Sequence, residues 1–246
     1  IGNIYVGKKF DGTPVFARDL KVVGAMALLL KEAIKPNLVQ TLENNPAILH
    51  GGPFASIAQG TNTVLATKMG LSLADYVVTE AGFGADLGAE KFLNIKCVSA
   101  GVAPNAALIL ATIRALRHHG GAKKEEYNTP DLQKVKLGIA NLEKHIENIQ
   151  QFGLKAVVAI NYFPHDSDEE IAFVQEFCKQ KGVEAIVSKG FSEGGEGTKA
   201  LAQAVVAIAE SNESHFQPLY DHQASIEDKI ATIATKIYGA RQVHYS

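Results

Sequence analysis

Residues 156–164 read Ala-Val-Val-Ala-Ile-Asn-Tyr-Phe-Pro, and residues 183–195 read Val-Glu-Ala-Ile-Val-Ser-Lys-Gly-Phe-Ser-Glu-Gly-Gly. In each stretch a short apolar run, 156–160 or 183–187, leads directly into a polar loop. A helical pattern over residues 167–181 separates the two runs. Apolar strands joined by a helix are typical of a parallel sheet covered on both faces. Ligands bind at the carboxyl ends of the strands in such sheets, so the sequence predicts an α/β fold with two neighbouring candidate binding loops.

The rest of the chain continues this alternation of helical and strand-like patterns. An Asp11-Gly12 turn within residues 1–16 favours a hairpin at the start of the chain. We expect residues 1–246 to form a single α/β domain, or a fragment of one, with a mostly parallel sheet flanked by helices. Further helices are predicted over residues 19–35, 38–42, 56–71, 130–150, 197–210 and 226–238, and further strands over residues 46–50, 74–79 and 106–113.

The composition sets modest bounds on function. The 246 residues are 46% hydrophobic with a formal net charge of −2, which gives no electrostatic footprint for nucleic acid or an anionic membrane. No apolar run reaches the roughly 18 residues of a membrane span, and no signal peptide opens the chain, which favours a cytoplasmic protein. Cys97 and Cys178 have neither a disulfide framework nor metal-ligand spacing, so we expect buried free thiols and no metal site. Because the chain starts at Ile1 rather than Met, we expect a processed or truncated piece.

Two nucleotide-binding motifs are disfavoured. Residues 2–9, Gly-Asn-Ile-Tyr-Val-Gly-Lys-Lys, superficially match a phosphate-binding loop. However, Lys9 stands where a Ser or Thr must hold the magnesium ion, and the motif requires a preceding strand. A dinucleotide oxidoreductase is disfavoured as well. The closest match to its glycine fingerprint, residues 82–88 (Gly-Phe-Gly-Ala-Asp-Leu-Gly), is one residue too long.

Residues 79–88 combine three glycines with the carboxylates of Glu80 and Asp86, directly after a predicted strand. Carboxylates in that position suit the ligation of a hydrated metal or the orientation of a phosphate. The pattern leaves an equal alternative, a tight connection in which Glu80 caps a helix or forms an ion pair. His50 and His119 also precede paired glycines. A lone histidine in such a place is more often a structural hydrogen-bonding group.

Asn161 and Phe163 form the sharpest candidate for base recognition. The side-chain amide of Asn161 carries paired donors and acceptors that complement an adenine edge. The ring of Phe163 could stack on that base or line one side of its pocket. The open alternative is that Asn161 forms a turn while Phe163 and Pro164 simply pack. Residues 141–148 are interpreted as a solvated helix face.

Six stretches of the sequence, taken in order along the chain, are long or specific enough to compare with a known family. They are residues 44–55 (Asn-Asn-Pro-Ala-Ile-Leu-His-Gly-Gly-Pro-Phe-Ala), 74–92 (Ala-Asp-Tyr-Val-Val-Thr-Glu-Ala-Gly-Phe-Gly-Ala-Asp-Leu-Gly-Ala-Glu-Lys-Phe), 111–121 (Ala-Thr-Ile-Arg-Ala-Leu-Arg-His-His-Gly-Gly), 141–148 (Asn-Leu-Glu-Lys-His-Ile-Glu-Asn), 157–163 and 237–240. Together they closely resemble the formate–tetrahydrofolate ligase family. The resemblance implies an ATP-dependent ligase in which formate attacks the terminal phosphate of ATP and tetrahydrofolate captures the formyl group from formyl phosphate. It also implies a core similar to P-loop nucleotide enzymes, Mg²⁺, activation by a monovalent cation, and a homo-oligomer.

Members of this family are more than twice as long as this chain, which resembles their middle segment. The resemblance places the glycine-rich phosphate loop and its lysine before this segment. We therefore expect a P-loop-like core that lacks the loop, and an isolated piece with little or no ligase activity. The alternative is a short homologue that serves as a non-catalytic binding or interaction module. The reading frame upstream of Ile1 would separate the two.

The resemblance also suggests roles for individual residues. Glu80 and Asp86 are expected near the phosphate and the metal, and His119 near the site of formyl transfer. The expected partners are the small molecules ATP, formate and tetrahydrofolate. The residues expected to line the nucleotide are Asn161, Phe163, Ser188, Lys189, Gly190, Gly194 and Gly195.

Overall fold

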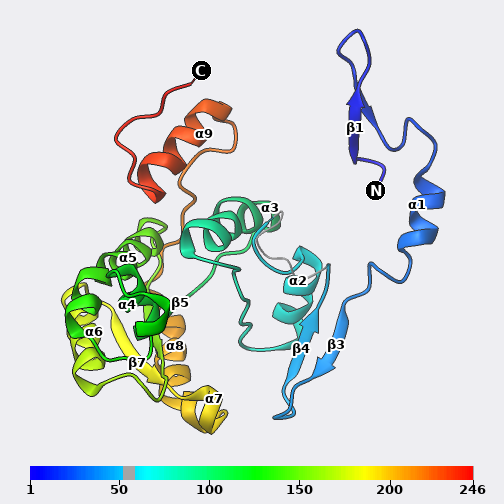
Figure 1. The fold of residues 1–246 in the computed structure, drawn as a ribbon. Helices are drawn as coiled ribbons and strands as arrows, with labels where there is room; N and C mark the ends of the chain where they lie inside the picture. Colours follow the sequence, from blue (N-terminus) through cyan, green and yellow to red (C-terminus); the bar gives the residue numbers. More distant parts are fainter. Residues whose placement is uncertain (52–58, 246) are drawn as a thin grey trace. The chain divides into compact units, whose positions relative to one another are not determined.

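The structure, a computed structural model, describes residues 1–51 and 59–245 (Figure 1). Its described residues group into two compact units. The first unit comprises residues 1–51 and 62–80, and the second unit comprises residues 59–61 and 81–245.

The first unit opens with a hairpin. Strands β1 (Tyr5–Lys8) and β2 (Pro14–Phe16) pair in antiparallel orientation. Asp11 Oδ1 accepts a hydrogen bond from the Thr13 amide at 2.9 Å, and Gly12 has a φ of +85°, which glycine adopts without strain. A hairpin therefore occupies the stretch that superficially matched a phosphate-binding loop.

A second antiparallel pair follows in the first unit, made of β3 (Asn37–Gln40) and β4 (Pro46–Leu49). The strand predicted over residues 46–50 is present, whereas the short helix predicted over residues 38–42 is wrong. The connecting turn holds Asn44 at a φ of +65°. Pairing with β4 thus determines the backbone of β3 against its local helical pattern, because strand preference depends on the partner strand.

The helices of the first unit are shorter than predicted. Helix α1 (Val23–Leu30) occupies only the middle of the helix predicted over residues 19–35. Helix α2 (Val64–Leu73) occupies the second half of the one predicted over residues 56–71. The beginning of that prediction falls on residues 52–58, which lie outside the described residues.

Residues 74–79 do not form the predicted buried strand. All of them are described, and they continue from α2 without pairing to any strand. Val77 packs over Gly70 of α2, and its methyl groups would lie 3.3 Å from a Cβ placed there. One apolar residue of this run thus contacts the helix, Tyr76 and Val78 are exposed, and the prediction of a buried strand was wrong.

The second unit begins with a helical stretch that the sequence pattern did not predict. It consists of the π-helical turns η1 (Ala85–Ala89) and η2 (Phe92–Cys97) and the short helix α3 (Val98–Ala100). Gly101 ends it in the left-handed conformation with a φ of +66°, as is common at helix C-termini.

A three-stranded parallel sheet in the order β5-β6-β7 forms the centre of the second unit. Its strands are β5 (Ala107–Ala111), β6 (Ala156–Asn161) and β7 (Glu184–Ser188). All three coincide with predicted strands to within two residues. The parallel sheet flanked by helices is therefore confirmed.

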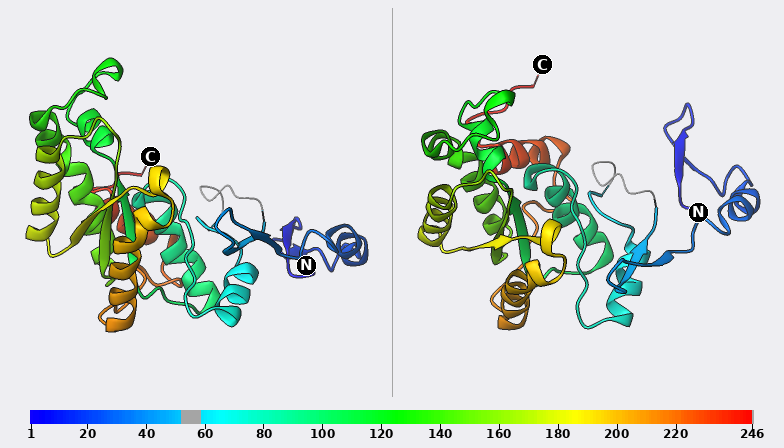
Figure 2. Two further views of the ribbon diagram at one scale, coloured as in Figure 1. Left: turned by 90° about the horizontal axis from the view of Figure 1, so that it is seen from below. Right: turned by 60° about the horizontal axis from the view of Figure 1, so that its bottom comes forward.

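Helices cover both faces of this sheet (Figures 1 and 2). On one face α4 (Ile113–His119), α5 (Leu132–Gln151) and α6 (Asp168–Gln180) enclose the main core, and on the other α8 (Lys199–Ser211) covers β6 and β7. Side chains alternate between these faces along β6, as the pleat of a strand requires. The main core includes Ile113, Leu116, Val135, Ile139, Leu142, Ile146, Val158, Ile160, Ile171, Val174 and Cys178, and the smaller core includes Val157, Ala159 and Leu201.

The remaining elements of the second unit are short. They are the 3₁₀ turns η3 (Lys124–Glu126) and η4 (Glu196–Thr198), helix α7 (Gly190–Glu193), and helix α9 (Ile226–Thr232) with its π-helical extension η5 (Ile233–Ile237). The last two together fill the helix predicted over residues 226–238. No helix in the described part of the chain has the length and apolar character needed to cross a membrane.

Both cysteines are buried free thiols, as predicted. Cys97 lies in η2 and Cys178 in α6, and both belong to the main core. Burial raises the pKa of each thiol to about 11.

Candidate functional site

Asn161 and Ser188 lie side by side at the carboxyl ends of β6 and β7, where they are paired in the parallel register. The Tyr162 amide donates a hydrogen bond to the Ser188 carbonyl at 3.0 Å and continues the ladder by one step. Because side chains alternate along a strand, Asn161 shares the face of Val157 and Ala159, which contact α8. The two predicted binding loops are therefore neighbours.

The loop that follows β6 is a closed turn. The Phe163 amide donates to Asp166 Oδ2 at 2.9 Å, and the Asp166 amide donates to the Phe163 carbonyl at 2.9 Å. The Phe163 side chain remains 38% exposed. Its ring is thus accessible, while its backbone is fixed by the side chain three residues later.

The loop that follows β7 is shaped by its glycines. Gly194 has a φ of +59°, which favours glycine. A Cβ on Gly190 would lie 2.7 Å from the Thr198 methyl group, and one on Gly197 would lie 2.7 Å from the Lys189 carbonyl. Gly190, Gly194 and Gly197 are therefore required by the loop's own packing.

The side chains of this second loop point in different directions. Ser188 is buried, with 8% of its surface exposed. Lys189 lies with its Nζ 5.3 Å from the centre of the Tyr162 ring and 3.7 Å from Glu193 Oε1. Phe191 is fully exposed. The structure therefore places Asn161, Phe163, Ser188 and Lys189 close in the fold without giving all four an open path to one ligand.

A buried ion pair next to the loop that follows β6 was not predicted. Arg117 in α4 and Glu170 in α6 form a two-pronged contact, with Nε–Oε1 at 2.7 Å and Nη2–Oε2 at 2.6 Å. The only signal in the sequence was Ser167 followed by Glu170, the spacing of a helix-start capping box, which the structure contains. The arginine gave no local signal.

The turn that carries Asp86 is held by close backbone contacts at neighbouring glycines. A Cβ on Gly88 would lie 1.9 Å from the Gly82 carbonyl oxygen, and one on Gly60 would lie 2.1 Å from the Gly88 carbonyl oxygen. The Gly82 amide also donates to the Gly60 carbonyl at 3.1 Å. These glycines are explained by close backbone contact, which holds the turn that carries Asp86.

His145 of α5 lies beside Asp86. A Cβ on Gly84 would be 2.3 Å from Asp86 Oδ1 and 3.1 Å from His145 Cε1. Burial lowers the pKa of His145. The negative charge of Asp86 raises this pKa in part, and the neighbouring His119 lowers it further. The interpretation of residues 141–148 as a solvated face was therefore wrong, because the packing of α5 against η1 buries much of this ring.

Of the other predicted residues, His119 is exposed at the end of α4, close enough to His145 beside Asp86 for its charge to act on that ring. Glu80 is exposed and belongs to the first unit, so its predicted place beside Asp86 stays a prediction. Both ring nitrogens of His50 have partners, the Thr63 hydroxyl at 2.8 Å and the Ala33 carbonyl at 3.0 Å, which agrees with a structural role.

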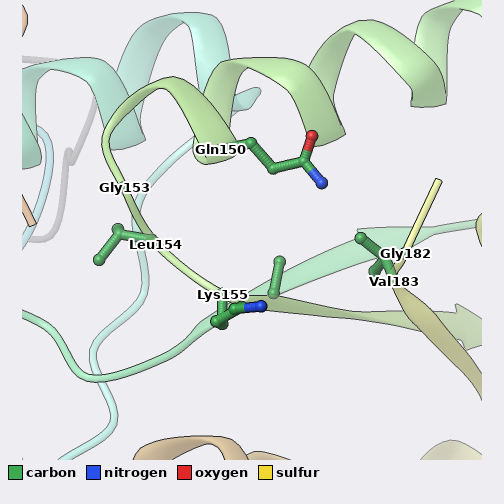
Figure 3. A pocket seen from close by; sticks show the side chains of 7 residues that line it. Gln150, Gly153, Leu154, Lys155, Gly182 and Val183 are labelled. Atoms are coloured by element: carbon green, nitrogen blue, oxygen red, sulfur yellow. The ribbon is translucent and has the colours of Figure 1, made fainter. Parts of the chain in front are cut away.

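A hollow of about 260 Å³ lies at the opposite, amino-terminal edge of the sheet (Figure 3). Ligands of parallel sheets bind at the carboxyl ends instead. Its cationic side chain, Lys155, pairs with Glu213 at 3.2 Å. This hollow is therefore not favoured as the site. Its lining residues are Gln150, Gly153, Leu154, Lys155, Ala156, Gly182 and Val183.

Among the described residues, we also looked for groups of side chains that could hold a metal ion. Within residues 1–51 and 59–245, no group of three or more His, Cys, Asp or Glu side chains is arranged to hold a metal ion. Magnesium, however, is commonly held by one or two carboxylates together with substrate phosphates and water.

Comparison with known proteins gives a consistent result over the whole chain. A family model described as formate–tetrahydrofolate ligase matches residues 1–246. The formate–tetrahydrofolate ligase of Rhizobium etli (strain CIAT 652) is 57% identical over 243 residues, which cover 99% of this chain and 44% of that protein. The enzyme of the same name from Rhizobium johnstonii (strain DSM 114642 / LMG 32736 / 3841) is 56% identical with the same coverage. The chain thus spans less than half the length of these relatives.

Proposed function

This chain belongs to the formate–tetrahydrofolate ligase family, and we propose that it contributes the nucleotide-base side of a site that joins formate to tetrahydrofolate with ATP. In the proposed reaction a formate oxygen attacks the terminal phosphorus of ATP, which releases ADP and gives formyl phosphate. The secondary amine of tetrahydrofolate then attacks the formyl carbon, loses its proton and displaces inorganic phosphate.

The observation that carries this proposal is the pairing of Asn161 with Ser188 at the carboxyl edge of the sheet. This is the edge where ligands bind in parallel α/β sheets. Within the described residues the Asn161 side-chain amide makes no hydrogen bond, so its donors and acceptor are available to a base. The partly exposed Phe163 ring stands two residues further on.

We assign the second loop a supporting role. Gly190, Gly194 and Gly195 shape the chain after Ser188, and Lys189 adds a cation close to Tyr162. A cation near a nucleotide stabilises phosphate charge. The triphosphate would still need the glycine-rich loop expected of a P-loop-like core, which the resemblance places before this segment.

Three residues remain candidates for contact with the reacting groups. Asp86 and Glu80 are proposed near the phosphate and the metal, and His119 near the site of formyl transfer. Asp86 is partly exposed and sits on a rigid turn, which suits a carboxylate that orients a hydrated magnesium–nucleotide complex. Bound magnesium would offset the negative charge of the phosphates. Activation by a monovalent cation and assembly into a homo-oligomer are also proposed on family grounds alone.

The experiment is an assay of the full-length protein with ATP, tetrahydrofolate and formate labelled with ¹⁸O. We expect ADP release that requires all three substrates, and one ¹⁸O atom from formate in each inorganic phosphate formed. Such transfer reports the bond between formate oxygen and phosphorus. ATP consumption that does not depend on formate, or phosphate without the label, would contradict the proposed reaction.

A further inference from the structure

We propose that Arg117 is a positioning residue for the nucleotide base. Its buried guanidinium holds the loop of residues 161–166 in place, and this loop carries Asn161 and Phe163. The inference rests on the proposed function, because it assumes that Asn161 and Phe163 meet the base. Arg117 itself is buried, with 1% of its side chain exposed, and so acts through its neighbours.

The guanidinium of Arg117 joins three segments of the chain. Besides its two bonds to Glu170, Nη1 donates to the Tyr127 carbonyl at 2.7 Å and Nη2 donates to the His165 carbonyl at 2.9 Å. Its Nη2 also lies 3.8 Å from Asp166 Oδ1. One side chain from α4 therefore holds the connection before α5 and the loop after β6.

Glu170 extends this network to two helix starts. Its Oε2 accepts from the Ser167 amide at 3.0 Å and from the Ser167 hydroxyl at 2.7 Å, and its Oε1 accepts from the Asp131 amide at 2.9 Å. A buried ion pair of this kind is weak evidence for stability by itself. In some proteins, a buried ion pair instead favours a single arrangement of the segments around it.

The link to the base site runs through Asp166. Its Oδ2 accepts the Phe163 amide, whereas its Oδ1 is buried and makes no hydrogen bond. The Arg117 guanidinium faces this buried carboxylate. Without Arg117, Asp166 would keep the Phe163 amide but lose a buried cationic neighbour, which would weaken the turn that fixes the Phe163 backbone.

The geometry calls for arginine rather than any cation. The planar guanidinium supplies several donors in a fixed fork, while a lysine ammonium is a point charge that cannot meet Glu170, Tyr127 and His165 together. A lysine at this position would restore the charge but not the arrangement of the loop.

The test uses the full-length protein and compares Arg117→Lys with the double variant Arg117→Met/Glu170→Met. The double variant removes both buried charges together, which proteins commonly tolerate. We expect the KM for ATP to rise about tenfold in the double variant and by less in Arg117→Lys. The kcat at saturating ATP and the KM for formate should stay within about threefold, since the reacting groups are untouched.

The matched control is Lys181→Met, which removes a partly exposed ion pair between Lys181, the residue that follows α6, and Glu143 of α5. Its KM for ATP should match that of the unmodified protein. Far-ultraviolet circular dichroism establishes that each variant is folded. Should the double variant not fold, the KM of folded Arg117→Lys decides the outcome.

A folded variant whose KM for ATP stays within about twofold of the unmodified value would overturn the positioning role. Asn161→Ala, measured in the same series, separates this result from failure of the proposed function. If Asn161→Ala raises the KM for ATP and the Arg117 variants do not, only the positioning inference fails. If Asn161→Ala has no effect either, the base site itself is misplaced.

Discussion

Asn161 and Ser188 occupy the same step of the parallel ladder, each as the last residue of its strand. A loop that carries an aromatic ring follows each of them, with Phe163 after β6 and Phe191 after β7. Two strand ends that are adjacent in space, although 27 residues apart in sequence, form the edge at which this fold type binds ligands. The predictions below follow from this edge and from the packing that supports it.

Replacement of Asn161 by alanine should weaken ATP binding selectively. Loss of a paired hydrogen bond to a base costs about 1–3 kcal/mol, so we expect the KM for ATP to rise by about 5- to 150-fold. The KM for formate should change little, because formate meets the other end of the nucleotide. Steady-state kinetics of the full-length protein measure both constants. The control is Gln180→Ala, an exposed position on α6, and an unchanged KM for ATP in Asn161→Ala would remove Asn161 from the base site.

Replacement of Gly88 by alanine should destabilise the turn that carries Asp86. The new Cβ would lie 1.9 Å from the Gly82 carbonyl oxygen, so backbone must move. Overpacking of this kind costs about 1–3 kcal/mol in the free energy of unfolding. Gly24→Ala is the control, because its Cβ meets open space within α1 and should leave stability unchanged or raise it by about 0.5–1 kcal/mol. Denaturant titration compares the two, and equal stability would contradict the close packing.

The buried ion pair predicts a specific dependence of stability on pH. Burial alone would raise the pKa of Glu170, but hydrogen bonds from Arg117, Ser167 and Asp131 outweigh it and lower the pKa from 4.5 to about 2. A depressed carboxyl pKa contributes stability above the unfolded value, and this contribution is lost as pH falls toward the folded value. We therefore expect a stabilising contribution at pH 7 that disappears between about pH 5 and pH 2.

Glu170→Gln tests this pH dependence. The difference in unfolding free energy between the unmodified protein and Glu170→Gln should be largest above about pH 5 and should shrink toward pH 2. Urea denaturation at a series of pH values measures it. A difference that stays constant over the whole range would show that protonation of Glu170 does not matter.

The two thiols should be unreactive in the native protein. Cys97 and Cys178 are buried, and burial raises the pKa of each to about 11, so little thiolate exists near neutral pH. Iodoacetamide at pH 7.5 should label neither residue before unfolding and both after denaturation. Mass spectrometry reads the result, and rapid labelling of either cysteine in the folded protein would contradict its burial.

Local patterns predicted the parts of the fold that are set by local forces. Residues 156–160 are apolar throughout because β6 is covered on both faces, so the strand was visible in sequence. Helix α6 starts where Ser167 and the following acids favour it. The α/β class and the adjacency of the two loops followed from such elements.

Long-range contacts account for what the sequence did not predict. A helix was predicted over residues 38–42, but residues 37–40 pair with β4. A strand was predicted over residues 74–79, but they pair with no strand, and Val77 contacts α2 instead. Arg117 and Glu170 are 53 residues apart, and no local period reveals their contact. His145 likewise lies beside Asp86 only because η1 packs against α5, a contact that no local pattern reveals.

The most direct test of the central claim is photolabelling of the full-length protein with 8-azido-ATP, followed by proteolysis and mass spectrometry. The azide sits on the adenine ring, so it reacts with whatever surrounds the base. We predict adducts in the peptides that carry residues 161–164 or 188–195, with labelling suppressed by excess ATP. ATP-protected labelling found only outside these two loops would contradict the assignment of the base to the carboxyl ends of β6 and β7.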